Sequence, residues 1–281
     1  MTYVIPRLPV ALTIAGSDSG GGAGIQADLK TFSALGVFGT SAITAITAQN
    51  PQGVAAVQGV EPQLAAQQIA QVMDYFKVGA VKIGLLYSAE IIHAVAEALE
   101  QAIAQRNSGE EKLPVVVDPV MIATSGARLL KEDAVDALGK RIFPLASLIT
   151  PNMDEAALLS GQQVNTDEHL APAAEEIYRR HGVPVLVKGG HLKGNDEAID
   201  ALYEGKAAEY FAAPYLLQVD SHGAGCTLSS AIAVYLMRGF PLADAISEGK
   251  NYLHQALANS LPTGKGDTLN HAFAPLPLEM L

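Results

Sequence analysis

Short apolar runs alternate with longer stretches of helical periodicity along the whole chain, and polar or glycine-rich breaks separate them. A short apolar run between such breaks is typical of a buried strand, whereas apolar residues three and four apart indicate a helix with one buried face. The alternation predicts βαβ units, and hence an α/β fold with a mostly parallel central sheet and helices on both faces. The predicted strands are residues 10–15, 41–47, 80–83, 115–117, 148–150 and 185–187. The predicted helices are residues 25–35, 62–76, 89–104, 131–140, 168–181, 226–238 and 242–261.

Two further features concern the edge of the sheet and the number of domains. Between residues 199 and 211, two β-like runs flank Gly205, which predicts a hairpin that adds a small antiparallel edge. Residues 107–112 are polar and form a predicted surface loop. No long linker rich in Pro, Gly or Ser divides the chain, so we expect residues 1–281 to form a single domain.

Composition narrows the classes of partner. The chain has 18 Lys and Arg against 29 Asp and Glu, a formal net charge of −11. This balance disfavours nucleic acid and anionic membranes as partners, so a phosphate site must gather positive potential locally, from a few lysines, backbone amides or a metal ion. One cysteine, Cys226, excludes an intramolecular disulfide. Together with an N-terminal segment that lacks the form of a signal peptide or a membrane span, it favours a cytoplasmic protein.

Polar residues follow the predicted strands at the points where ligands of open α/β sheets bind. These positions are residues 16–18, 49–50, 118–119, 150–152 and 188–191. Loops are polar in any protein, which is the plain alternative. Asp118 and Lys188, however, each end a run too hydrophobic to be an exposed strand, which favours a polar site that handles phosphate.

Two glycine clusters each precede a predicted helix. Residues 20–24 either bring backbone close to a ligand or form a tight turn from strand to helix. In the second cluster, the amides of residues 223–226 are expected to point at one spot, where the helix dipole favours an anion. The same field is expected to lower the pKa of the Cys226 thiol, although a lone cysteine is more often a small buried hydrophobe.

Asn152 and Glu155 lie one helical turn apart, so both of their side-chain oxygens face one way. Hard oxygen ligands of this kind suit Mg²⁺, directly or through its waters. The pair is equally typical of a helix cap, in which Asn152 is the N-cap residue and Glu155 completes a capping box. Asp118, which precedes a proline, is either a metal ligand or a turn residue.

Taken together, these motifs resemble the ribokinase-like carbohydrate and vitamin kinases. Within that group the chain is similar to the hydroxymethylpyrimidine/phosphomethylpyrimidine kinases of thiamin biosynthesis. The similarity runs through nearly the whole chain. The stretches that carry it are residues 15–18, 21–28, 47–50, 81–84, 118–121, 150–155, 187–191 and 222–229.

The resemblance implies a ribokinase-like fold with a small β flap, ATP and Mg²⁺ as cofactors, and a homodimer. It implies transfer of the γ-phosphoryl group to 4-amino-5-hydroxymethyl-2-methylpyrimidine and then to the resulting monophosphate. The pyrimidine would contact Gln49, Asp18, Ala23 and Gly24. The nucleotide and Mg²⁺ would contact Lys188, Asn152, Gly225, Glu155 and Asp118. The reacting groups would contact Gly223, Ala224, Gly225, Lys188 and Cys226, and Cys226 would take the hydroxymethyl proton.

Some positions depart from the pattern of these kinases. Ala224 stands where they have threonine, and Leu85 where they have methionine, a swap that an apolar pocket wall tolerates. Residues 264–271 also differ. A pyridoxal-type vitamin kinase and a catalytically silent ligand-binding protein of the same fold are the alternatives. A nicotinamide oxidoreductase is disfavoured because the glycines fit its motif only loosely. His191, His222 and His271 are either phosphate contacts or, as is more common for a histidine in a polar loop, structural residues, and none is expected to be catalytic.

Overall fold

Nine strands form one continuous sheet in the order β3-β2-β1-β4-β5-β6-β7-β8-β9. The computed structural model describes residues 8–106, 112–121, 130, 134–190, 196–217 and 219–275. The strands of the sheet are β1 (Val10–Asp18), β2 (Phe38–Asn50), β3 (Gly53–Gly59), β4 (Val78–Ile83), β5 (Val115–Val117), β6 (Leu148–Ile149), β7 (Val185–Lys188), β8 (Glu197–Tyr203) and β9 (Glu209–Pro214). In this order the six neighbouring strands β2, β1, β4, β5, β6 and β7 pair in parallel. At the two edges, β3 pairs antiparallel with β2, and β8 pairs antiparallel with both β7 and β9. The predicted mostly parallel sheet is confirmed.

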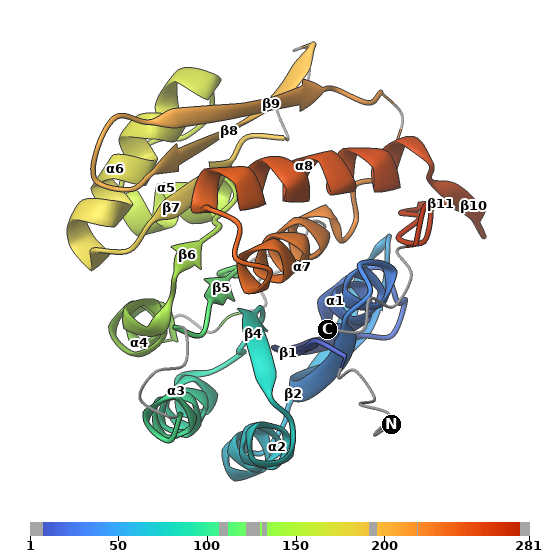
Figure 1. The fold of residues 1–281 in the computed structure, drawn as a ribbon. Helices are drawn as coiled ribbons and strands as arrows, with labels where there is room; N and C mark the ends of the chain where they lie inside the picture. The colour runs from blue at the N-terminus through green and yellow to red at the C-terminus, as the bar shows by residue number, and fades with distance from the viewer. Residues whose placement is uncertain are drawn as a thin grey trace, which may run out of the picture.

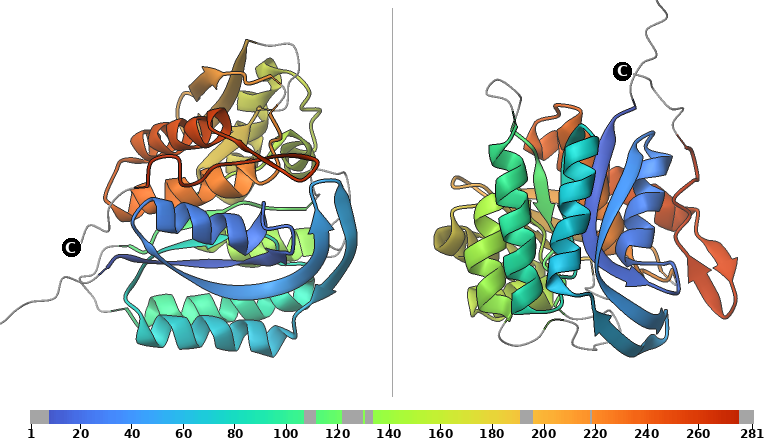
Figure 2. Two further views of the ribbon diagram at one scale, coloured as in Figure 1. Left: turned by 90° about the vertical axis from the view of Figure 1, so that its right-hand side faces the viewer. Right: turned by 90° about the horizontal axis from the view of Figure 1, so that it is seen from below.

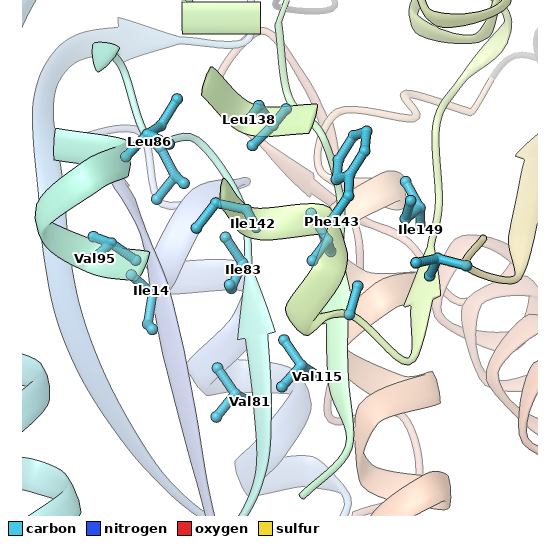
Figure 3. Close-up of a cluster of buried hydrophobic side chains, with 14 of the residues drawn as sticks. Ile14, Val81, Ile83, Leu86, Val95, Val115, Leu138, Ile142, Phe143 and Ile149 are labelled. Carbon is cyan, nitrogen blue, oxygen red and sulfur yellow. The ribbon is translucent and has the colours of Figure 1, made fainter. Parts of the chain in front are cut away.

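Helices cover both faces of this sheet (Figure 1). On one face lie α1 (Gly24–Ala34), α7 (Ala224–Met237) and α8 (Leu242–Ala258). On the other lie α2 (Pro62–Tyr75), α3 (Ala89–Ala104), α4 (Ala134–Ala137), α5 (Met153–Ser160) and α6 (Leu170–His181). The largest buried cluster fills the space between this second layer and the sheet, and Figure 3 shows its central part. No helix among the described residues is both long and apolar enough to span a bilayer.

Side chains alternate between the two faces along each strand, and this alternation decides where the charged residues lie. Val115 and Val117 pack in the large cluster of Figure 3, whereas Val116, between them, packs toward α7. Lys82 alternates with apolar neighbours on β4 in the same way and faces α1 and α7. Lys188, at the end of β7, follows the same rule and lies beside the start of α7.

Most predicted elements are confirmed, with differences at the edges. The hairpin around Gly205 is present as β8 and β9, with Gly205 at a φ of 94°. The sequence pattern missed β3, which pairs with β2 at the opposite edge and bends away with it in Figure 2. It also missed a hairpin of β10 (Leu261–Thr263) and β11 (Gly266–Thr268), since it predicts that the preceding helix continues to residue 261, whereas that helix ends at Ala258.

The helix predicted over residues 131–140 is helical throughout its described part, residues 134–140, but only the first four of these residues are α-helical. Residues 131–133 lie outside the described residues, as do residues 107–111 of the predicted polar loop. The chain is α-helical over Ala134–Ala137 and then widens into a π-helical turn, Leu138–Ile142. Pro144 in the following turn has no N–H to donate, so regular α-helical bonding cannot continue through it.

One buried ion pair joins the sheet to the helical layer of α1 and α7. Lys82 Nζ lies 2.8 Å from Oδ1 of Asp28, and neither side chain reaches solvent. Asp28 also accepts hydrogen bonds from the hydroxyls of Thr13 (2.6 Å) and Ser230 (2.7 Å). Burial acts to lower the pKa of Lys82, but the neighbouring Asp28 carboxylate outweighs it and holds that pKa above its usual range. The network therefore ties together β1, β4, α1 and α7.

We expect Lys82→Met to lower the free energy of unfolding by about 3–5 kcal/mol, because it leaves the Asp28 carboxylate buried without its cation. Denaturant unfolding followed by circular dichroism measures this. The matched control is Lys140→Met, which breaks the exposed pair of Lys140 with Asp136 at 2.7 Å and should change stability by less than about 1 kcal/mol. Equal effects of the two substitutions would contradict a stabilising role for the buried pair.

Candidate active site

The predicted site residues gather at the carboxyl ends of the parallel strands, beside the N-terminus of α7. Asp118 directly follows β5, Asn152 follows β6, and Lys188 ends β7. The amide of Lys188 donates to the carbonyl of Pro151 at 2.9 Å, which holds the loop after β6 against β7. The arrangement follows from the parallel pairing, because strands that run the same way end at the same edge.

Lys188 and Asp118 form a buried ion pair at this edge. Lys188 Nζ lies 2.6 Å from Oδ1 of Asp118, and the two side chains are 11% and 3% exposed. Burial acts to lower the pKa of Lys188, but the charges of Asp118 and Glu155 raise it, so the lysine is a cation at neutral pH. A Cβ on Gly225 would lie 3.0 Å from Lys188 Nζ, so glycine lets the first turn of α7 approach the ammonium group closely.

Asn152 and Glu155 form the capping box that the sequence offered as one alternative. Asn152 Oδ1 accepts from the amide of Glu155 at 2.9 Å, and Glu155 Oε2 accepts from the amide of Asn152 at 2.8 Å. Burial raises the pKa of Glu155 to about 7; the charge of Lys188 acts to lower it, whereas that of Asp118 adds to the rise. A cation placed here would favour the ionised carboxylate.

The second glycine cluster opens α7 as predicted. Gly223 adopts a left-handed φ of 86° and is the N-cap residue, and no side chain caps this end. One expectation needs correction: the amide of Ala224 donates to the carbonyl of Ser221 at 3.0 Å and is not available to a ligand. The amides of Gly225 and Cys226 lie in the first turn, where helix geometry gives an N–H no intrahelical partner. The anion site therefore has fewer backbone donors than the four successive amides that the sequence predicts.

The expected acidity of Cys226 is wrong. Part of the residue reaches solvent, but the protein packed around its sulfur raises the pKa of the thiol to about 11. The charge of Lys82 and a hydrogen bond from the amide of Gly24 act to lower that pKa, while the charges of Asp28 and Asp118 raise it further. The position at a helix N-terminus therefore does not make this cysteine a thiolate, because burial and nearby carboxylates outweigh it.

The first glycine cluster lies beside Gln49 at the end of β2. The amide of Gln49 donates to Ser19 Oγ at 2.8 Å, and Ser19 Oγ donates to the carbonyl of Gln49 at 2.9 Å. Gln49 is partly exposed, and its side-chain oxygen accepts from Thr47 Oγ1 at 3.1 Å. Gly20 packs against this end of β2, since a Cβ there would lie 3.1 Å from the Gln49 carbonyl oxygen. Gln49 therefore lies beside the first glycine cluster.

The two glycine clusters touch each other. Gly24 adopts a φ of 58°, and its amide donates to the sulfur of Cys226. A Cβ on Gly223 would overlap the carbonyl of Gly22. Ala23, the N-cap residue of α1, lies between these contacts and is partly exposed. The proposed pyrimidine and phosphoryl positions therefore adjoin at the starts of α1 and α7.

Sequence reasoning gave no role to several residues that the fold brings to this site. The Lys82–Asp28 pair lies under the first turns of α7, and a lysine inside an apolar strand was the signal for it. His222 contacts Asp18 at 2.9 Å, a pairing across 204 positions that no local pattern reveals. His271 is buried and contacts Thr227 at 3.0 Å, whereas His191 lies outside the described residues.

Known proteins match the chain over nearly its whole length. The sequence profile described as phosphomethylpyrimidine kinase matches residues 18–271. A hydroxymethylpyrimidine/phosphomethylpyrimidine kinase of Rhizobium meliloti is 50% identical over 267 residues, which cover 94% of this chain and 97% of that protein. The thiamine biosynthesis bifunctional protein ThiED of Geobacter sulfurreducens is 46% identical over 94% of this chain. The chain spans about half of that protein, since the match covers 52% of its length.

A solved structure shows the same fold. The ADP complex of Bacillus subtilis pyridoxal kinase superposes with a TM-score of 0.82 at 34% identity, over 95% of this chain and 98% of that one. The ribokinase-like fold implied by the sequence motifs is confirmed.

We expect alkylation of Cys226 by iodoacetamide to be slow and to accelerate about tenfold per pH unit up to at least pH 10, because only the thiolate reacts. At pH 8 the rate should be on the order of 100-fold below that of the unfolded chain, whose cysteine titrates near ~8.5. Mass spectrometry gives the rate directly, since the chain has one cysteine. A plateau below pH 8 would show an acidic thiol and contradict this account.

Proposed function

This chain belongs to the phosphomethylpyrimidine kinase family, and from that premise we propose that it phosphorylates 4-amino-5-hydroxymethyl-2-methylpyrimidine with ATP, and then phosphorylates the monophosphate to the diphosphate. This activity belongs to thiamin biosynthesis. A homodimer, which family resemblance implies, and a cytoplasmic location, which the single cysteine favours, are part of the same proposal; sedimentation and cell fractionation test them.

One observation carries the proposal: a buried lysine, two buried carboxylates and the open end of a helix meet at one place. Lys188 is the cation, Asp118 and Glu155 are the carboxylates, and the amides of Gly225 and Cys226 belong to α7. A phosphoryl group in transfer spreads negative charge over its oxygens, so positioned positive potential stabilises it. In a chain of net charge −11, this is the local gathering of positive potential that a phosphate site requires.

The donors at this edge fit Mg²⁺ held with phosphate oxygens and water. Asp118 and Glu155 offer hard oxygen ligands, and each is only 2% exposed. Asn152 Oδ1 and Glu155 Oε2 already accept backbone hydrogen bonds, so we propose that they act mainly through metal-bound waters, a mode that Mg²⁺ favours. When bound, Mg²⁺ would neutralise developing charge on the phosphates. Among the described residues, no group of three or more His, Cys, Asp or Glu forms a metal cage.

The side chains around the phosphates would act by position and charge. Lys188, already a buried cation, would contact an oxygen of the transferring group without desolvation at the moment of reaction. Gly225 keeps that ammonium group within reach of the α7 amides, because any Cβ there would press on it. Holding the acceptor hydroxyl and the phosphoryl group in one place removes much of the entropic barrier to their reaction.

Cys226 is proposed to contact the reacting hydroxyl as part of the anion site. With a thiol pKa of about 11, forming the thiolate at neutral pH costs about 5 kcal/mol, which opposes a role as the base. A loose phosphoryl transfer needs little help from a base, since the protein contributes mostly position and electrostatics. The protonated thiol is instead a weak donor beside the Gly24 amide.

Gln49 and the first glycine cluster are proposed to hold the pyrimidine. The amide group of Gln49 offers both a donor and an acceptor to the aminopyrimidine edge. Leu85 contacts Gly16 beside the cluster, where a Cβ on Gly16 would lie 3.0 Å from its Cδ2. Leu85 also packs in a small cluster with Val54, Val57, Tyr87 and Val120, which supplies an apolar wall for an aromatic ring.

An acceptor panel tests the activity. ADP release with Mg·ATP should be observed with the hydroxymethylpyrimidine and with its monophosphate, and removal of Mg²⁺ by EDTA should abolish it. Pyridoxal is the key comparison, because the pyridoxal kinase of Bacillus subtilis has the same fold. A higher kcat/KM for pyridoxal than for either pyrimidine would assign the chain to the pyridoxal class, and no turnover with any heteroaromatic alcohol would contradict a kinase function.

We expect Cys226→Ala to slow both transfers to a similar degree, by roughly 10- to 100-fold, because a member of the anion site serves each. Single-turnover rates with the alcohol and with the monophosphate measure the two transfers separately. A loss confined to the first transfer would contradict this assignment, because only the alcohol has a proton for a base to remove; the monophosphate is already an anion near neutral pH. Cys226→Ser, which keeps a small polar group, is the matched control.

A further inference from the structure

The structure assigns Asp18 and His222 a shared role that rests on the proposed function: they are a positioning pair that fastens the acceptor loop (residues 18–24) to the phosphoryl loop (residues 221–226), so that the two half-sites form together. Family resemblance places Asp18 on the pyrimidine, and the sequence analysis gives His222 no catalytic role.

The Asp18 carboxylate accepts hydrogen bonds mainly from groups of the protein itself. Its Oδ1 accepts from the amide of Gly20 at 2.8 Å. Its Oδ2 accepts from the amides of Ala23 at 2.9 Å and Gly22 at 3.2 Å, and it contacts His222 Nε2 at 2.9 Å. A carboxylate has about four acceptor positions, so four donors leave little for a substrate. The side chain is 3% exposed, which agrees with an internal role.

The contact with His222 links two parts of the chain that are 204 positions apart in the sequence. Burial acts to raise the pKa of Asp18, but the hydrogen bonds from His222 and from the amides of Ala23 and Gly20 outweigh it and lower that pKa. Asp18 is therefore a carboxylate at neutral pH, and the Nε2 of His222 must carry the proton in their hydrogen bond. The imidazole is itself 11% exposed, so water competes little for this bond.

Backbone contacts on either side of the pair make the fit tight. A Cβ on Gly22 would lie 2.6 Å from His222 Cδ2, so the imidazole lies directly on the acceptor loop. The next residue, Gly223, approaches Gly22 so closely that a Cβ would overlap its carbonyl. The amide of His222 donates to Asp220 Oδ1 at 2.9 Å, which fixes the imidazole's own loop.

The geometry has a functional consequence for both substrates. Ala23, which is proposed to meet the pyrimidine, donates its amide to the same carboxylate that holds His222, the residue before Gly223. Displacing His222 would therefore move the acceptor loop as well as the first turn of α7. Substitution of a residue that positions only one of the two loops would instead impair the binding of only one substrate, the pyrimidine or the nucleotide.

The test compares His222→Leu with His222→Gln. Leucine fills the space without a donor, whereas the glutamine amide nitrogen reaches the position of Nε2 and keeps the hydrogen bond. We expect His222→Leu to raise the KM for the hydroxymethylpyrimidine and to lower kcat, each on the order of 10-fold or more, while His222→Gln stays within about threefold of the wild type. His93→Leu, on the exposed side of α3, is the matched control and should leave both constants unchanged.

A readout that needs no turnover separates this inference from the proposed activity. In the ligand-free protein, hydrogen–deuterium exchange of residues 20–24 and 223–226 should accelerate together in His222→Leu and remain protected in His222→Gln. Faster exchange in the phosphoryl loop alone, or equal loss of activity in both variants, would overturn the inference. If the wild type phosphorylates no pyrimidine, the proposed function fails, and exchange still decides whether the two loops are coupled.

Discussion

Two lysine–aspartate pairs lie buried between the central sheet and the first turns of α7, and the rest of the site is arranged around them. Lys82 pairs with Asp28 and Lys188 with Asp118, at 2.8 Å and 2.6 Å. A buried charge that loses its partner costs several kcal/mol, so these four side chains hold the sheet and helices in one register. The alternation of side chains along β4 and β7 directs both lysines to the same face, where α7 begins.

These buried pairs explain why glycines line the proposed site. Gly225 leaves room for Lys188, and Gly223 and Gly24 use left-handed backbone where the two loops cross. The charged pairs and the close backbone contacts together fix one place for the acceptor and one for the phosphoryl group. Because the site is made in advance of substrate binding, little reorganisation remains for the reaction itself.

The sequence predicted what depends on local periodicity and strand ends. It placed β5 and α3 at their observed limits and brought Asp118, Lys188 and Asn152 to one edge of the sheet. It missed β3 because the apolar run in residues 53–59 is only four residues of Val and Ala between polar and glycine positions, and none of these residues is fully buried. It misjudged the Cys226 thiol because a helix N-terminus is visible in a sequence, whereas the burial of a sulfur near Asp28 and Asp118 is not. Contacts made only by the fold, such as that of His222, have no local signal.

A crystal structure with Mg·ADP, aluminium fluoride and the hydroxymethylpyrimidine tests the central claim most directly. The fluoride complex mimics the phosphoryl group in transfer, and the account predicts that it lies within hydrogen-bonding distance of the amides of Gly225 and Cys226 and of Lys188 Nζ, with the pyrimidine against Gln49. A fluoride complex bound away from the first turn of α7, with Lys188 paired only to Asp118, would contradict it.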